Sequence, residues 1–201
     1  MPIEYWFPTP IYFSYIDEPM LSKIQKDFDH VFSDLKSNGQ FIKKEDWGDD
    51  KHSLSDTSFK TSIIEKYQLV DFQNEIVKHV QTFLLDPSFN RTTPLNRFKI
   101  PEAWMTLTRK GEMAHRHDHG SADLAGVYYY QTNGEDGSIY FDSPNVVVKT
   151  NHVLQSIVNR IVHNPIVGKI ILFPGGLDHG VLPNSTDSER ISISFNIYFE
   201  R

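Results

Sequence analysis

The spacing of apolar residues changes near residue 101, and this change constrains the fold more than any other feature of the sequence. Before it, apolar residues recur at steps of three and four, which is the period of an amphipathic helix. After it, apolar and polar residues alternate, which is the period of a half-buried strand. Because helices precede strands and do not alternate with them, we expect an α+β layout and not a series of βαβ units.

The first half of the chain predicts two helices. Residues 21–35 and 69–84 each carry an apolar stripe at helical spacing. His79 falls on the polar side of the second helix, and we interpret it as a surface histidine. The aromatic run at residues 5–15 is broken by two prolines, which suits an edge strand. The polar segment 41–60 is expected to be a loop.

The second half predicts about seven short strands separated by Gly, Pro and Asn turn signals. The candidate strands are residues 103–108, 124–131, 138–141, 146–149, 157–163, 169–173 and 190–199. Short strands in this number favour a β-sandwich or a jelly-roll barrel, with the helices on one outer face. Because we find no repeat or long linker, residues 1–201 are expected to form one domain, with a mainly helical flank (1–100) and a jelly-roll core (101–201).

The composition restricts the chemistry of the chain. It contains nine histidines and no cysteine, which excludes a disulfide framework, a thiolate zinc site and a cysteine nucleophile. A metal would therefore be held by nitrogen and oxygen ligands. The net charge of −6, without clustered basic residues, argues against nucleic-acid binding. No apolar run reaches the ~20 residues of a membrane helix, and the start lacks a signal-peptide pattern, so we expect a cytoplasmic protein.

Three histidines, His115, His117 and His119, lie at alternate positions, so that in an extended chain their imidazoles project to the same side. His179 follows a Gly-rich corner 60 residues after the last of them. Mononuclear iron(II) sites of the two-histidine, one-carboxylate type leave positions open for further ligands, and such a site can combine neighbouring residues with a distant histidine. Asp118 would point the other way, as a surface group or a neighbour of the ligands. On the cluster alone, a solvated His-rich loop is an equally good interpretation.

The last predicted strand, residues 190–199, alternates between an apolar and a polar face. Arg190 and Ser192 share the polar face, where no acid accompanies them. A guanidinium there could bind a carboxylate through two parallel hydrogen bonds inside a barrel. A bound dicarboxylate would supply the anionic partner that a buried arginine needs. A salt bridge to Asp187 is the alternative.

The order His117, His179, Arg190, together with the segments FPGGLDH and RISISFN, resembles the iron(II)- and 2-oxoglutarate-dependent oxygenases. A bacterial and phage branch of that superfamily shares the aromatic start, which here is WFPTPIY. The resemblance covers essentially the whole chain. Each segment is a weak signal alone, but their order and spacing, with the GVYY strand between them, are specific.

The resemblance implies a double-stranded β-helix (jelly-roll) core with N-terminal flanking helices. It implies that iron(II) is bound by His117 and His179, and that Arg190 pairs with the far carboxylate of 2-oxoglutarate. Tyr128 falls where related enzymes use a tyrosine hydroxyl on the same carboxylate, and Ser192 could add a second hydroxyl.

The chain departs from the superfamily at one ligand. The superfamily has an acid two positions after the first histidine, whereas this chain has His119. Either three imidazoles bind the metal, or Asp118 or Asp123 completes the site. Three neutral ligands would leave the ion more positive and could change which metal is kept.

The implied activity is decarboxylation of 2-oxoglutarate with O2, coupled to hydroxylation of a C–H bond in a primary substrate that the sequence does not identify. Trp104 and Thr106 are candidate wall residues of the site, although plain core packing suits Trp104 better. A non-enzymatic, cupin-like jelly-roll that binds a metal or ligand is the alternative, although such a module has no need of Arg190 in its cavity. A structural phage or particle protein fits the polar residues less well. The aromatic first strand could serve as a homodimer edge.

Overall fold

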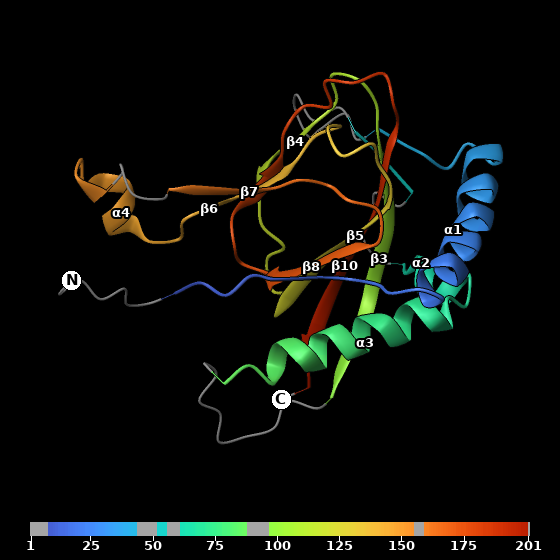
Figure 1. Ribbon diagram of the computed structural model, residues 1–201, viewed down its shortest axis with the longest axis horizontal. Helices are drawn as coiled ribbons and strands as arrows, with labels where there is room; N and C mark the ends of the chain where they lie inside the picture. The colour runs from blue at the N-terminus through green and yellow to red at the C-terminus, as the bar shows by residue number, and fades with distance from the viewer. Residues whose placement is uncertain (1–7, 44–51, 56–60, 88–96, 155–158, 201) are drawn as a thin grey trace.

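The structure, a computed structural model, describes residues 8–43, 52–55, 61–87, 97–154 and 159–200. Helices occupy mainly the first half and strands the second (Figure 1). The helices are α1 (Met20–Ser37), α2 (Ile63–Lys66), α3 (Val70–Leu84) and α4 (Val146–Thr150). The strands are β1 (Tyr12–Tyr15), β2 (Ser53–Leu54), β3 (Phe98–Thr108), β4 (Ala114–His117), β5 (Leu124–Gln131), β6 (Ile139–Asp142), β7 (Arg160–His163), β8 (Lys169–Pro174), β9 (His179–Val181) and β10 (Arg190–Phe199).

The strands form two sheets, whose orders are β1-β8-β5-β10-β3-β2 and β4-β9-β6-β7. Every pair of named strands is antiparallel. From β3 onward, successive strands alternate between the two sheets, apart from the β6–β7 hairpin. This alternation is the connectivity of a jelly roll, so the expected α+β fold with a jelly-roll core is confirmed.

Two apolar clusters join the layers. The larger one lies between the helices and the outer side of the larger sheet, where the ring of Phe72 packs edge-on against Phe28 at 4.9 Å and against Phe195 at 6.2 Å. The odd-numbered residues of β10 face this cluster, as the alternation predicted. The smaller cluster lies between the sheets and includes Phe141 and Phe173. The even-numbered residues of β10 are therefore turned toward the space between the sheets.

The surface assignment of His79 is wrong. Its side chain is 3% exposed, because β1 runs beside α3 and covers that flank of the helix. The hydroxyl of Tyr12 lies 2.8 Å from His79 Nδ1, and the carboxylate of Glu75 lies 3.6 Å from Nε2. The helical pattern predicted the apolar stripe of α3 correctly, but it could not show that β1 packs against the polar side of this helix.

The segment 146–149 is not a strand but part of α4. Its three valines favour a strand locally. Asn145 overrides that preference, since its side-chain oxygen accepts the backbone N–H of Val147 at 2.9 Å, as an N-cap does. α4 projects from the β6–β7 end of the molecule (Figure 1).

The remaining predicted elements agree with the structure within a few residues. β1 is an edge strand, as expected, although residues 5–7 of the predicted segment lie outside the described residues. The described part of segment 41–60 contains β2, which the loop assignment did not foresee, and strand 157–163 begins at Arg160 in the described residues. Among the described helices, none is both long and apolar enough to span a bilayer.

Candidate metal centre

A cavity of about 680 Å³ lies between the two sheets. The polar face of β10 lines it with Arg190, Ser192, Ser194, Asn196 and Tyr198. From β3, Trp104 and Thr106 contribute to its wall. The side chains that the strand period assigned to a polar face thus meet in one cavity between the layers.

Three histidines meet at this cavity. His117 ends β4 and His179 begins β9, and the two are direct partners in the β4–β9 pair. His119 follows two residues after β4, and its backbone N–H donates to the carbonyl of Gly175 at 2.8 Å, which ties this turn to the Gly-rich corner before β9. One ring nitrogen from each histidine lies within 4.8 Å of the other two. The predicted ligands, separated by 60 residues of sequence, are therefore adjacent in space.

Each imidazole is oriented through its Nδ1 atom. His117 Nδ1 lies 2.7 Å from the carbonyl oxygen of His115, and His179 Nδ1 lies 2.9 Å from that of Leu177. Because a carbonyl oxygen only accepts, both Nδ1 atoms carry the proton. His119 Nδ1 lies 2.5 Å from the side-chain oxygen of Asn196 and is likewise a donor. In the neutral form of each ring, the lone pair is then on Nε2 and is available to a metal, an arrangement typical of metal-binding histidines.

The Nε2 atoms of His119 and His179 lie only 3.2 Å apart. Burial, and then the neighbouring imidazoles, lower the pKa of His119 to about 4 and that of His179 to about 3. Near neutral pH both rings are neutral and carry their one proton on Nδ1, so the lone pairs of the two Nε2 atoms face each other at hydrogen-bond distance. A bound cation turns this repulsion into attraction, and the donor set therefore fits a metal ion.

Neither candidate carboxylate joins the cluster. Asp118 accepts the backbone N–H of Gly120 at 2.8 Å, and Asp123 accepts that of Phe199 at 2.8 Å. His115 lines the cavity but does not belong to the group of three. Among the described residues, the possible ligands are three imidazoles and no acid.

Arg190 is 3% exposed and begins β10 at the cavity. Its Nη1 donates to the carbonyls of Asp136 at 3.3 Å and Gly137 at 2.5 Å, and its Nη2 donates to the hydroxyl of Thr108 at 2.9 Å. Nε has no hydrogen-bond partner among the described residues. The alternative salt bridge is absent, because Asp187 pairs with Lys110 at 2.9 Å. Within the described chain, this buried cation has neutral acceptors only and two unused N–H groups.

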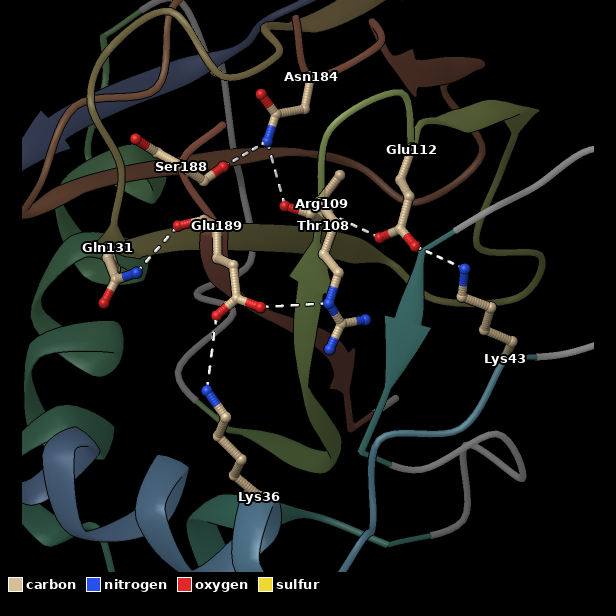
Figure 2. Close-up of polar contacts among 9 residues, drawn as sticks. All are labelled: Lys36, Lys43, Thr108, Arg109, Glu112, Gln131, Asn184, Ser188 and Glu189. Atoms are coloured by element: carbon tan, nitrogen blue, oxygen red, sulfur yellow. Dashed lines mark hydrogen bonds and ion pairs between the residues drawn. The ribbon is translucent and has the colours of Figure 1, made fainter. Parts of the chain in front are cut away.

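A polar network fixes the two loops beside Arg190 (Figure 2). The Asn184 amide donates to the carbonyls of Thr108 and Ser188, at 3.2 and 2.7 Å. Glu189, the residue before β10, accepts from Arg109 at 3.1 Å, and the Gln131 amide donates to its backbone carbonyl at 2.9 Å. These contacts join the ends of β3, β5 and β10, so the guanidinium is held by a rigid surround.

The expectation for Tyr128 is wrong. Its side chain points to the helices, where it stacks on Phe28 at 5.7 Å and receives a hydrogen bond from Gln25 at 3.4 Å. Tyr129 lines the cavity instead, and it is the direct partner of Ser192 in the β5–β10 pair. Burial raises the pKa of Tyr129 to about 12, and the positive charge of Arg190 offsets part of that rise. Tyr129 faces the cavity because directly opposed residues share a face, and the register that opposes it to Ser192 comes from the structure.

Two further residues of the site were not singled out from the sequence. Asn196 holds His119, as described above, and Glu102 accepts the Asn196 amide N–H at 2.5 Å. Asn196 was placed only on the polar face of its strand. Glu102 carried no signal, because its role depends on the register between β3 and β10.

Comparison with known proteins gives a family and a fold. Residues 102–196 match the sequence model of a family described as "Putative 2OG-Fe(II) oxygenase". Similar solved structures include a prolyl-4-hydroxylase from Pseudomonas putida, with 15% identity, a TM-score of 0.59, and coverage of 96% of this chain and 93% of that one. Another is HygX from Streptomyces hygroscopicus with nickel and 2-oxoglutarate bound, with 13% identity, a TM-score of 0.58, and coverage of 94% and 82%. A third is SnoK, a non-heme alpha-ketoglutarate-dependent carbocyclase of nogalamycin biosynthesis, with 10% identity, a TM-score of 0.64, and coverage of 96% and 80%. At these identities the likeness concerns the fold. No curated protein sequence matches the chain.

Proposed function

We propose that the chain is an iron(II)- and 2-oxoglutarate-dependent oxygenase, as the family match of residues 102–196 and the shared fold support, and that His117, His119 and His179 bind its iron(II). The observation that carries the proposal is the orientation of the rings. Each Nδ1 is committed as a donor to an oxygen, so three Nε2 lone pairs converge in one place. Such convergence is costly without a cation and suits borderline metals such as iron(II).

We propose that 2-oxoglutarate binds with its far carboxylate on Arg190. The two unused N–H groups of the guanidinium, on Nε and Nη2, form the parallel pair that matches a carboxylate. Tyr129 and Ser192 line the same cavity and would add hydroxyl groups, so Tyr129 takes the role first expected of Tyr128. A binding module without turnover would gain nothing from this desolvated cation.

Bound iron(II) would supply the redox chemistry by which a substrate C–H bond, O2 and 2-oxoglutarate become a C–OH group, succinate and CO2. The residues of the chain have other tasks. The three imidazoles would hold the ion and leave its remaining positions to ligands from the cavity. The buried aromatic wall, including Trp104 and Phe173, keeps water from the reacting centre.

We further propose that residues 1–201 form one domain, since side chains of α1, α3, β5, β8 and β10 share one apolar cluster. A homodimer through β1 is supported by its place at the sheet edge and by the exposure of Phe13 and Tyr15. A cytoplasmic location accords with the absence of cysteine. The primary substrate is a separate question from these proposals.

The test uses the purified protein with iron(II) and 2-oxoglutarate. Without oxygen we expect a weak visible charge-transfer band, and under air we expect succinate. The variant His179→Ala should lose both, whereas His163→Ala, which removes a histidine on β7 outside the cluster, should keep both. If the wild type gives neither band nor succinate, the enzyme assignment fails. Normal iron and 2-oxoglutarate binding by His179→Ala would refute the ligand assignment alone.

A further inference from the structure

The three imidazoles are not held alike. His117 and His179 donate to backbone carbonyls, whereas His119 donates to a side chain, Asn196. Behind that amide lies a carboxylate, since Asn196 Nδ2 donates to Glu102 Oε2 at 2.5 Å. A chain of two hydrogen bonds thus leads from the Glu102 carboxylate through one amide to the ring of His119.

The backbone fixes this arrangement. Asn196 of β10 and Glu102 of β3 are directly opposed partners in an antiparallel pair, so their side chains emerge on the same face. The Tyr198 hydroxyl also donates to Glu102 Oε2, at 3.2 Å. Asn196 is 6% exposed, and Glu102 and His119 on either side of it are half-buried.

The orientation of the Asn196 amide follows from its neighbours. A carboxylate only accepts, so the amide N–H groups face Glu102 and the amide oxygen faces His119. The oxygen in turn requires the proton of His119 on Nδ1 and leaves the lone pair on Nε2. The charge of Glu102 therefore dictates, through one intermediate, which nitrogen of His119 is free to bind a metal.

His119 also stands where the resemblance to the superfamily places an acid. A ligand set of three neutral imidazoles carries no negative charge to offset that of a divalent ion. Carboxylates behind metal-bound histidines raise the basicity of the ring and fix its orientation. Glu102 supplies such a carboxylate to one imidazole of the three, and that imidazole is the one in the position of the acid.

We propose that Glu102 and Asn196 are positioning residues of the metal centre. Asn196 fixes the tautomer and rotamer of His119, and Glu102 returns through the amide part of the negative charge that a carboxylate ligand would bring. This inference rests on the proposed metal site of the three histidines.

Cobalt(II) titration tests the proposal without turnover, since the ligand-field absorption of the bound ion reports both affinity and geometry. Glu102→Gln keeps an acceptor for Asn196 and removes the charge, and Asn196→Leu removes the link itself. Loss of such outer partners typically weakens metal binding about 10- to 100-fold, and we expect that range for both variants. Glu75→Gln, which neutralises a buried carboxylate on α3 outside the cavity, is the matched control and should bind like the wild type.

A double variant distinguishes charge from packing. With Asn196→Asp and Glu102→Gln together, the carboxylate at position 196 accepts from His119 and the amide at position 102 donates to that carboxylate. The carboxylate and the amide have then exchanged places, and both hydrogen bonds can still form. We expect this double variant to bind cobalt(II) at least as tightly as the wild type, and Asn196→Asp alone to bind it more weakly, because two carboxylates would then face each other.

The outcomes separate this inference from the one on which it rests. Wild-type affinity and spectrum in Glu102→Gln and Asn196→Leu, with binding lost in His179→Ala, would overturn the role of Glu102 and Asn196 and leave the metal site standing. Failure of the double variant to recover affinity, while it melts like the wild type without metal, would also overturn it. Absence of cobalt(II) binding by the wild type would instead refute the metal site.

Discussion

Replacing Arg190 by methionine should abolish recognition of the far carboxylate of 2-oxoglutarate while leaving the fold and the metal site in place. Methionine has similar length and no charge. The guanidinium already donates to three neutral acceptors, and its remaining two N–H groups have no partner among the described residues. The loss therefore falls on the ligand, on these three acceptors and on the buried carboxylate of Asp136, whose charge offsets part of the lowering that burial imposes on the pKa of Arg190. That carboxylate keeps its hydrogen bonds from Thr132 and from the backbone N–H of Asn133.

The size of the effect follows from those two N–H groups. A hydrogen bond to a charged partner contributes about 1.5–3 kcal/mol, so two contribute roughly 3–6 kcal/mol. Because about 1.4 kcal/mol corresponds to a tenfold change in affinity, the dissociation constant of 2-oxoglutarate should rise about 10²- to 10⁴-fold. Lys169→Met, which removes a buried cation of β8 outside the cavity, is the matched control and should leave the constant unchanged.

Calorimetric titration of the cobalt(II) protein with two ligands isolates the far carboxylate. 2-Oxobutanoate has the same keto-acid group as 2-oxoglutarate but lacks that carboxylate. The wild type and Lys169→Met should prefer 2-oxoglutarate by about 10²- to 10⁴-fold, and Arg190→Met should bind both ligands with similar, weak affinity. If Arg190→Met retained the wild-type preference, the carboxylate would be bound elsewhere and the assignment of Arg190 would be wrong.

Two other expectations concern the corner before β9 and the flank of α3. A Cβ on Gly175 would lie 2.1 Å from the backbone oxygen of Ala122 and would displace the turn that carries His119. Gly175→Ala should therefore lower the rate of succinate formation about 10²-fold, as a misplacement of roughly 1 Å does. Gly176→Ala is the control, because its Cβ meets nothing within 4 Å, and equal activities of the two variants would contradict the expectation. Burial lowers the pKa of His79 below its unfolded value of 6.5, so that as the pH falls the unfolded chain takes up a proton on this imidazole before the folded protein does. The contribution of neutral His79 to the free energy of unfolding is therefore fully present above pH 6.5 and is lost as the pH falls through the folded pKa. Urea midpoints at about pH 7 and about pH 5 should differ less in His79→Gln than in the wild type, and an unchanged difference would show that His79 does not contribute.

The elements with strong periodicity were predictable from the sequence. β5 and β10 have the predicted bounds, because long alternating runs in a covered sheet leave one register of inside and outside. α1 and α3 follow from their apolar stripes. α4 was missed because a single cap, Asn145, outweighs three β-branched residues, and that contest depends on local geometry and not on pattern.

The proposed ligands of the site could be named from the sequence for a different reason. His117 and His179 lie at strand ends joined by short, Gly-containing corners, so local chemistry and the resemblance to a family agree on them. His119 was assigned with two carboxylates left open as alternatives. The structure favours His119 as the proposed ligand, since Asp118 and Asp123 each accept a backbone N–H and neither belongs to the group of three imidazoles.

The wrong assignment of Tyr128 and the unforeseen roles of Asn196 and Glu102 share a cause, the register between strands. Tyr128 and Tyr129 differ by one position, and only their pairing with Ile193 and Ser192 tells which of them faces the cavity. Glu102 likewise acquires its role from being opposite Asn196. A single sequence gives the face of each strand but not the offset between strands 90 residues apart, and a shift by one residue would exchange every inward side chain for its neighbour. The register of β10 against β5 puts Tyr129 beside Ser192, and its register against β3 sets Glu102 beside Asn196 and so behind His119. Both ends of the cavity, the one that holds Arg190 and the one that holds the three histidines, therefore depend on one strand, β10, and a slip in that strand would disable both together.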